Sequence, residues 1–267
     1  MKSLPAETDF VVIGAGVAGL RAAIELADAG RVLVLAKQEV TNSRAQSATG
    51  ESTAALSDEE EVMLHLLDTL VAGDGLCLQQ AVKTLVDDGS ERIEEVIAWG
   101  DQLDRKGTKL IFETEASYTH SHVLRAPGGS TGHEILRVLQ AKVQAHKQIS
   151  LLEFEFCTGL LTEDARVSGV SLISEKGLPE DVPCSAVLLA TGGLGQIYRN
   201  TTNKRKRCRK TGLASNSLLE GLVYGARAGR AMREEVKHAV ACGCRNRRLD
   251  SASLGHHVER RRHYAHA

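Results

Sequence analysis

The chain has 267 residues, of which 42% are apolar, 25% charged and 3% aromatic, and its formal net charge is −1. This composition is typical of a globular protein with a core of Leu, Val and Ala, and it excludes a disulfide-stapled miniprotein and a wholly disordered chain. The net charge conceals two parts of opposite sign: residues 199–267 hold 17 Lys and Arg against 5 Asp and Glu, a net +12, whereas residues 1–198 carry a net −13.

The first 35 residues predict a dinucleotide-binding unit. Residues 9–13 are a short β-branched run typical of a buried strand, residues 20–29 repeat apolar side chains at helical spacing, and residues 31–35 indicate a second strand. Residues 14–19 (Gly-Ala-Gly-Val-Ala-Gly) match the GxGxxG pattern, whose glycines allow a tight turn, the approach of a pyrophosphate and close helix packing. We therefore expect the start of this helix to bind the diphosphate of a dinucleotide.

Residues after the second strand bear on which dinucleotide binds. After the second strand, the acidic residue that usually holds the adenosine ribose is missing or displaced to Glu39. Lys37 could approach a phosphate or simply be a solvated strand end, and the spacing leaves both interpretations open. A second buried strand at residues 186–190 ends in Thr-Gly-Gly (residues 191–193). This pairing of two strand–glycine units resembles that of the two-dinucleotide-binding-domain flavoproteins, and the resemblance favours FAD over a nicotinamide cofactor used alone.

The remaining elements complete an α/β pattern. Further helices are expected at residues 58–72, 76–99, 132–145 and 216–233, and a further strand at residues 151–157. The sequence therefore predicts an α/β fold: an FAD-binding, Rossmann-like parallel sheet with flanking helices.

The sequence also bears on compartment and metals. No apolar run has the length of a membrane helix, and the six cysteines form no disulfide-scaffold pattern, so we expect a cytoplasmic protein without a membrane span. Cys242 and Cys244 lie near His238, His256 and His257, but neither CxxC spacing nor a clear partner pair accompanies them. We therefore expect no metal site.

Three longer segments carry a family resemblance: residues 192–203 (Gly-Gly-Leu-Gly-Gln-Ile-Tyr-Arg-Asn-Thr-Thr-Asn), residues 65–77 (His-Leu-Leu-Asp-Thr-Leu-Val-Ala-Gly-Asp-Gly-Leu-Cys) and residues 213–221 (Leu-Ala-Ser-Asn-Ser-Leu-Leu-Glu-Gly). With the glycine loops they resemble the fumarate reductase/succinate dehydrogenase flavoprotein superfamily, and within it the L-aspartate oxidase family. The resemblance covers residues 8–203 and 213–233.

The resemblance implies an activity. The family oxidises L-aspartate to iminoaspartate, the first step of de novo NAD biosynthesis, with oxygen or fumarate as electron acceptor and quinolinate synthase as a downstream partner. Residues 43–50 contain no His, the residue through which the dehydrogenase and reductase branches attach FAD, so the resemblance implies noncovalent FAD.

The resemblance also implies site residues by matching position. Asn216, Ser217 and Leu218 would reach the isoalloxazine through a helix N-terminus, and the backbone at Cys157 would face the adenine. The full set of implied FAD residues is Gly14, Ala15, Gly16, Ala18, Gly19, Lys37, Ser43, Ser47, Ala48, Thr49, Gly50, Cys157, Thr191, Gly192, Gly193, Asn216, Ser217 and Leu218. Glu115 is the one candidate catalytic residue, with a solvated loop carboxylate as the competing interpretation.

The sequence departs from the family where substrate would bind. Family members are longer, and here a basic run at residues 204–210 stands where a substrate-capping domain is expected, between about 203 and 213. The position of the Arg that clamps the substrate carboxylate holds Gly212. We therefore expect one FAD-binding domain at residues 8–233 without a capping domain, followed by a basic, disordered tail at residues 237–267.

These observations leave three functional hypotheses. The first is FAD-dependent oxidation of L-aspartate, and the second is a noncatalytic flavin-binding remnant that lacks the substrate clamp. The third is a basic-tailed nucleic-acid-binding protein, because the six basic residues of 204–210 and the tail could contact phosphates nonspecifically. We do not expect nucleic acid as the partner, since no nucleic-acid-binding motif or interleaved aromatic residues accompany the charge.

Overall fold

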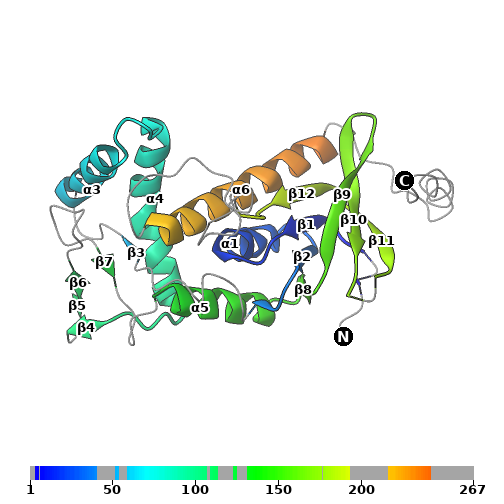
Figure 1. The fold of residues 1–267 in the computed structure, drawn as a ribbon, viewed down its shortest axis with the longest axis horizontal. Helices are drawn as coiled ribbons and strands as arrows, with labels where there is room; N and C mark the ends of the chain where they lie inside the picture. The colour runs from blue at the N-terminus through cyan, green and yellow to red at the C-terminus, as the bar shows by residue number, and fades with distance from the viewer. Residues whose placement is uncertain are drawn as a thin grey trace, which may run out of the picture.

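The structure is a computed structural model, and it describes residues 4–5, 7–40, 52–53, 59–106, 109–113, 123–124, 131–175, 177–192 and 216–241. Its centre is a parallel sheet in the order β12-β1-β2-β8 (Figure 1). The strands are β1 (Phe10–Ile13), β2 (Val32–Ala36), β8 (Ile149–Glu153) and β12 (Ala186–Leu189). The predicted α/β class, a parallel sheet with flanking helices, is confirmed.

Helices cover one face of this sheet and an antiparallel meander covers the other. The helices on that face are α1 (Val17–Leu26), α4 (Gln79–Ala98), α5 (Thr131–Ala145) and α6 (Asn216–Ala241), and α3 (Glu59–Ala72) packs on α4 away from the sheet. The meander consists of β9 (Phe156–Glu163), β10 (Arg166–Ile173) and β11 (Pro179–Pro183). Because both faces are covered, the strands of the central sheet are apolar on both sides.

Two small antiparallel sheets lie beyond the central one. They are the sheet of β3 (Ser52–Thr53), β7 (Val123–Leu124) and β6 (Phe112–Glu113), and the pair of β4 (Arg105–Lys106) and β5 (Lys109–Leu110). In the part of the chain that the structure describes, no helix is long and apolar enough to cross a membrane.

Side chains alternate between two cores along the central strands. Phe10 and Val12 of β1 face the helices and pack in a core formed largely by α1, α4, α5 and α6, whereas Val11 faces the meander. On the meander side it packs in a cluster with Leu33 and Val170. Each strand therefore contributes to both cores, as expected of a period-two element buried on both faces.

The structure corrects the strand expected at residues 151–157. Phe154 has a φ of 61°, a left-handed conformation that ends β8 at Glu153 and redirects the chain into β9 from Phe156. One apolar stretch therefore supplies a strand to each of two sheets. Cys157 belongs to the meander and not to the parallel sheet.

Helix boundaries also differ from the expectations. The first helix begins at Val17 rather than at residue 20 and ends at Leu26. Gly16 is therefore its N-cap residue, and Gly19 lies in its first turn. The third expected helix begins at Gln79 rather than at residue 76. The last helix continues to Ala241, beyond its expected end at residue 233.

A stripe of glycines brings α6 directly against α1. Gly221, Gly225 and Gly229 recur every four residues and therefore share one face of α6. A Cβ at Gly225 would lie 2.5 Å from the carbonyl oxygen of Ala18, and one at Gly229 would lie 2.9 Å from that of Ala22. The two helices thus touch backbone to backbone, which no larger residue at these positions allows.

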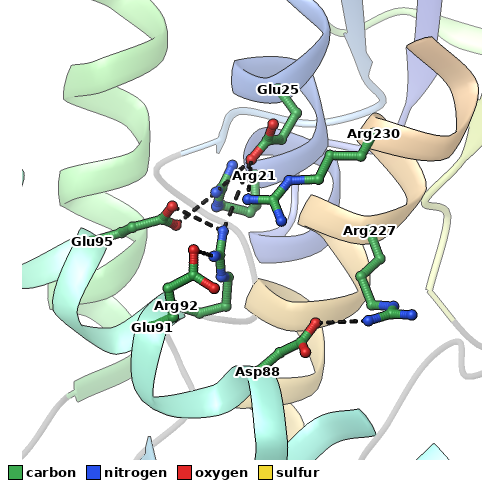
Figure 2. Close-up of polar contacts among 8 residues, drawn as sticks. All are labelled: Arg21, Glu25, Asp88, Glu91, Arg92, Glu95, Arg227 and Arg230. Atoms are coloured by element: carbon green, nitrogen blue, oxygen red, sulfur yellow. Dashed lines mark hydrogen bonds and ion pairs between the residues drawn. The ribbon is translucent and has the colours of Figure 1, made fainter. Parts of the chain in front are cut away.

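A buried charge network joins α1 to α4 and α6 (Figure 2). Arg21, 1% exposed, donates to Glu25 at 2.8 Å and to Glu95 at 2.6 Å, and its guanidinium lies 5.1 Å from the Trp99 ring centroid. The second buried arginine, Arg92, donates to Glu95 at 2.8 Å. Glu25 and Glu95 are 12% and 27% exposed, so removing either carboxylate would leave a buried guanidinium without one of its partners, which destabilises the fold.

The glycine stripe gives a first prediction. We expect Gly225→Ala to lower the free energy of unfolding by about 2 kcal/mol or more, because the new Cβ overlaps the Ala18 backbone. The clash outweighs the gain of about 1 kcal/mol that Ala normally has over Gly inside a helix. Urea denaturation followed by circular dichroism measures the change.

Gly159→Ala is the control, because a Cβ there would meet no atom within 4 Å. It should stay within about 1 kcal/mol of the unchanged chain. A stabilised Gly225→Ala variant would contradict the close packing of α6 on α1.

Candidate functional site

The two glycine-rich segments predicted from the sequence meet at one end of the parallel sheet. Gly14, directly after β1, has a φ of 114°, which favours glycine, and a Cβ there would lie 2.3 Å from the carbonyl oxygen of Ala190. The Ala190 N–H donates to the Ile13 carbonyl at 2.9 Å, which continues the pairing of β12 with β1. The β1–α1 turn therefore rests on the chain that follows β12.

The start of α1 has the features of an anion-binding site. Gly16 is its N-cap residue, and no side chain caps the helix. A Cβ at Gly16 would meet no atom within 4 Å, so the space beside this residue is open, whereas one at Gly19 would lie 1.9 Å from the Gly14 carbonyl oxygen. The first N–H groups and the positive end of the helix dipole favour a phosphate there. The residues present thus fit the diphosphate of a dinucleotide.

The turn after β12 borders the same region. Thr191 and Gly192 are both exposed, and Gly192 has a φ of 73°. Of the other motif residues, Ala15 is buried and Ala18 lies under Gly225 of α6. The loop expected at Thr191 and Gly192 therefore lies next to the β1–α1 turn, while Ala15 and Ala18 serve packing.

The end of β2 presents polar side chains. Lys37 and Glu39 are exposed just beyond the strand, and the Val40 N–H donates to the Glu153 carboxylate at the end of β8, 2.7 Å away. An exposed lysine and an exposed carboxylate are both present, so a phosphate contact from Lys37 and a ribose contact from Glu39 both remain predictions.

Cys157 lies in β9, half-buried against the core between the parallel sheet and the meander. Its thiol donates to the Gly159 carbonyl at 3.6 Å, and burial raises the pKa of the thiol above its usual range. A contact from its backbone to an adenine stays a prediction.

Asn216 begins α6, but its side chain is turned toward α3. Its amide nitrogen donates to the Thr69 hydroxyl at 3.2 Å, and its amide oxygen lies 3.1 Å from Nε2 of His65, which donates in the tautomer that protonates that nitrogen. All three residues are fully buried. Ser217 is exposed and Leu218 is buried, so Ser217 has the side chain of the three that is open to a ligand.

Several predicted site residues fall outside the residues that the structure describes. They are Glu115, Ser43, Ser47, Ala48, Thr49, Gly50 and Gly193. Their assignments remain predictions.

The partners of Asn216 and the buried arginines were not predicted from the sequence. His65 and Thr69 stand four residues apart and so share one face of a helix, a spacing that could have indicated a polar contact. Arg21 follows Leu20 in a helix with an otherwise apolar inner face, and nothing in the local sequence identifies its distant partner Glu95.

A second titratable cluster occupies the junction of α4 and α5. Asp101 is 9% exposed, and burial, followed by the nearby Glu134 carboxylate, raises its pKa from 3.8 to about 7. Glu134 accepts hydrogen bonds from Arg137, at 2.7 and 2.8 Å, and from the Gln102 N–H at 3.0 Å. The Arg137 guanidinium lowers the pKa of Glu134, so in this pair of carboxyl groups Glu134 keeps the charge and Asp101 takes up the proton.

Comparisons with known proteins agree with this geometry. Residues 9–242 match the FAD binding domain family, and the chain belongs to that family. FAD is therefore its cofactor.

Among curated proteins, the relatives of this chain include L-aspartate oxidases. The chain is 34% identical to L-aspartate oxidase of Agrobacterium fabrum over 227 residues, which cover 85% of this chain and 41% of the relative. It is 38% identical to the chloroplastic L-aspartate oxidase of Arabidopsis thaliana over 201 residues, which cover 73% of this chain and 31% of the relative. The expected resemblance to L-aspartate oxidase is confirmed, and the chain spans less than half the length of these relatives.

Solved structures place the fold in the expected superfamily. A variant of E. coli quinol fumarate reductase superimposes with a TM-score of 0.69 at 28% identity, covering 76% of this chain and 35% of that one. The Sdh1 complex of Mycobacterium smegmatis superimposes with a TM-score of 0.68 at 28% identity. The match covers 74% of this chain and 36% of that one.

The open space at Gly16 gives a second prediction. We expect Gly16→Ala to weaken FAD binding at least about tenfold, because its methyl group would occupy the space that a diphosphate needs. The melting temperature of the FAD-free protein should not change, since that methyl group meets no protein atom. Fluorescence titration with FAD and thermal melting of the apoprotein measure the two effects.

Gly19→Ala is the matched comparison, because its methyl group would collide with the Gly14 carbonyl. That variant should lose both FAD affinity and stability. Unchanged FAD binding by Gly16→Ala would show that the diphosphate does not lie beside this residue.

Asp101 gives a pH prediction. Its folded pKa lies above the unfolded value, so between about pH 4 and pH 7 the folded state keeps a proton that the unfolded chain releases. Stability due to this group therefore falls as the pH rises through that range. We expect Asp101→Asn to be about 2 kcal/mol more stable than the unchanged chain at pH 8, and equal to it near pH 4.

Urea denaturation at both pH values measures the difference. Asp28→Asn, which removes a carboxyl group at an exposed position, is the control for the substitution itself. An Asp101→Asn variant whose advantage is the same at pH 4 and pH 8 would argue against a buried proton on this carboxyl group.

Proposed function

We propose that this chain binds FAD noncovalently and oxidises L-aspartate to iminoaspartate. The observation that carries the proposal is the identity of 34–38% with L-aspartate oxidases over 73–85% of the chain. The glycine turns that meet at Gly14 and Ala190 support it, because they form the kind of cradle that a dinucleotide requires.

The residues of the chain have defined roles in this proposal. The first turn of α1 binds the diphosphate, Gly14 allows the chain to turn beneath it, and Thr191 and Gly192 border the same space. Bound FAD supplies the redox chemistry, accepting two electrons from the substrate for transfer to oxygen or fumarate. Glu115 would contribute to the substrate side, and residues 43–50, which contain no His, agree with noncovalent binding.

A second function is a noncatalytic flavin-binding protein. It is favoured by Gly212, which stands where the resemblance places the Arg that clamps the substrate carboxylate, because glycine offers no bidentate donor to a carboxylate. In this alternative the FAD-binding domain of residues 8–233 has no substrate-capping domain.

The partners belong to the same proposal. L-aspartate as substrate, oxygen or fumarate as acceptor and quinolinate synthase as the downstream enzyme all rest on the resemblance. A cytoplasmic location also stays a prediction, since the named relatives include chloroplastic proteins as well as bacterial ones.

The first experiment separates the functions by flavin and by substrate. We expect the purified chain to carry FAD, detected by its visible absorption and released by denaturation. Adding L-aspartate without oxygen should bleach that absorption, whereas D-aspartate should not. Gly16→Ala, which is expected to bind FAD weakly, is the matched control for nonspecific flavin.

The outcomes point to different functions. If the chain carries FAD but L-aspartate does not reduce it, the result would contradict oxidase activity and support the noncatalytic flavin-binding function. A chain that binds no FAD but binds DNA with an affinity falling steeply with salt would favour the nucleic-acid hypothesis.

A further inference from the structure

Helix α3 turns polar side chains toward the protein and apolar ones toward water. His65, Asp68 and Thr69 are buried at 0%, 8% and 0% exposure, whereas Leu67 is 49% and Val71 79% exposed. This is the reverse of an ordinary surface helix, whose apolar stripe faces the core. Burying polar groups costs free energy unless they are hydrogen-bonded, so the polar contacts of α3 set its orientation. Such departures from the usual pattern are expected at functional positions.

The contacts of α3 converge on the first residue of α6. The Asn216 amide nitrogen donates to the Thr69 hydroxyl at 3.2 Å, and Nε2 of His65 lies 3.1 Å from the Asn216 amide oxygen. All three residues are buried at 0% exposure. A buried amide held at both ends keeps one orientation, because turning it away would leave its polar atoms unpaired. We call His65, Thr69 and Asn216 the α3–α6 clamp.

The α3–α6 clamp lies at the end of the molecule where the diphosphate is expected. A Cβ at Gly221 would lie 2.9 Å from the Val17 side chain, at the start of α1, and one at Gly229 would lie 2.8 Å from Glu25, near the end of α1. The two helices therefore run in the same direction. Asn216 stands five residues before Gly221, so α6 begins about 7 Å, along its own axis, before it meets the start of α1. Both helices thus begin at the carboxyl end of the parallel sheet.

A second segment expected to bind FAD also reaches α6. Strand β3 contacts α6, and Figure 1 shows it beside the start of that helix. The loop at residues 47–50, which the family resemblance places on FAD, ends two residues before Ser52, the first residue of β3. This neighbour agrees with the expectation that the start of α6 reaches the isoalloxazine.

The electrostatic effect of a helix N-terminus depends on the order of its first turn. The positive end of the dipole comes from the first N–H groups and falls off within one turn, so it acts on a neighbouring ring only where those groups keep a fixed direction. Reduction adds negative charge to a flavin ring, and a positive helix end therefore stabilises reduced FAD more than oxidised FAD. Holding the first residue of α6 in place would thus raise the reduction potential of FAD bound beside it.

We propose that His65 and Thr69 are positioning residues for the flavin. Through the buried amide of Asn216 they hold the first turn of α6 against bound FAD and raise its reduction potential. The proposal rests on the FAD site described above, and in particular on the expected contact of Ser217 and Leu218 with the isoalloxazine. It does not require that the chain oxidises L-aspartate.

The reduction potential of FAD bound to the full chain tests the proposal, measured without substrate by titration against a redox dye of known potential. Thr69→Val removes the hydroxyl and keeps nearly the same shape. We expect it to weaken the preference for reduced over oxidised FAD about tenfold. For a two-electron couple, that change lowers the potential by about 30 mV. Thr69→Ser keeps a hydroxyl and should keep the original potential.

Tyr224→Phe is the matched control. The Tyr224 hydroxyl donates to the Ala81 carbonyl at 2.7 Å, so this variant also removes a hydrogen bond that attaches α6 to its neighbours, about two turns beyond Asn216. It should lower stability without changing the potential. An equal fall in Tyr224→Phe and Thr69→Val would overturn the proposal, because general loosening of α6 would then explain both.

Hydrogen exchange in the FAD-free protein gives a second measurement. In an α-helix the N–H of Glu220 pairs with the carbonyl of Asn216, so its exchange rate reports the order of the first turn of α6. We expect this rate to rise about tenfold in Thr69→Val and to stay the same in Tyr224→Phe. His65→Leu, which removes the other partner of Asn216, should act like Thr69→Val and takes its place if that variant folds poorly.

The outcomes separate this proposal from the FAD site on which it rests. Bound FAD whose potential is the same in Thr69→Val, His65→Leu and the unchanged chain would overturn the positioning role alone. An unchanged exchange rate at Glu220 in both variants would do the same. A purified chain that binds no FAD would overturn the FAD site and the positioning role together.

Discussion

The close contact of α1 with its neighbours is the constraint on which this structure depends. On one side Gly19 brings the first turn of the helix against the Gly14 carbonyl, and on another Gly225 brings α6 against Ala18. Both contacts are shorter than any side chain allows. They fix the position of the helix N-terminus, and the direction of its first N–H groups decides where an anion can bind. The binding geometry is thus set by packing behind the site as much as by the loop in front of it.

The buried charges add orientation to this packing. Van der Waals contact between two glycine-lined helices has little directional preference, whereas Arg21 is held by Glu25 on its own helix and by Glu95 on α4. Arg230 of α6 lies 3.4 Å from Glu25 and completes the connection (Figure 2). The buried Arg21 therefore holds α1 and α4 in one relative arrangement, because its charge cannot be left unpaired away from water, and Arg230, 40% exposed, adds a more solvated contact to α6.

Sequence patterns correctly predicted those elements of the fold that depend on interactions between residues close in the sequence. The GxGxxG turn, the three apolar strands at β1, β2 and β12, and the amphipathic α5 each follow from a short stretch of sequence. The break at Phe154 could not be predicted in this way, because the apolar residues on both sides of it are strand formers and only the pairing with two different sheets separates them. The polar inner face of α3 was likewise missed, since its partner Asn216 stands 147 residues beyond Thr69.

The same holds for the candidate site. The glycines at 14, 16 and 19 were assigned from the motif. The structure gives Gly14 a positive φ and packs Gly19 against the Gly14 carbonyl, whereas a diphosphate contact at Gly16 stays a prediction. For Asn216 the position at the start of a helix was predicted correctly, but the direction of its side chain depends on α3, which the local sequence does not describe.

The contact between α1 and α6 has a consequence for synthesis of the chain. The dinucleotide-binding unit is encoded in the first 36 residues, yet the surface of α1 around Ala18 is covered by glycines at 221 and 225. A ribosome therefore releases the strands and the phosphate-binding turn long before the helix that completes their packing. Folding of this unit is a late event, which depends on contacts between the two ends of the described chain and is correspondingly slow.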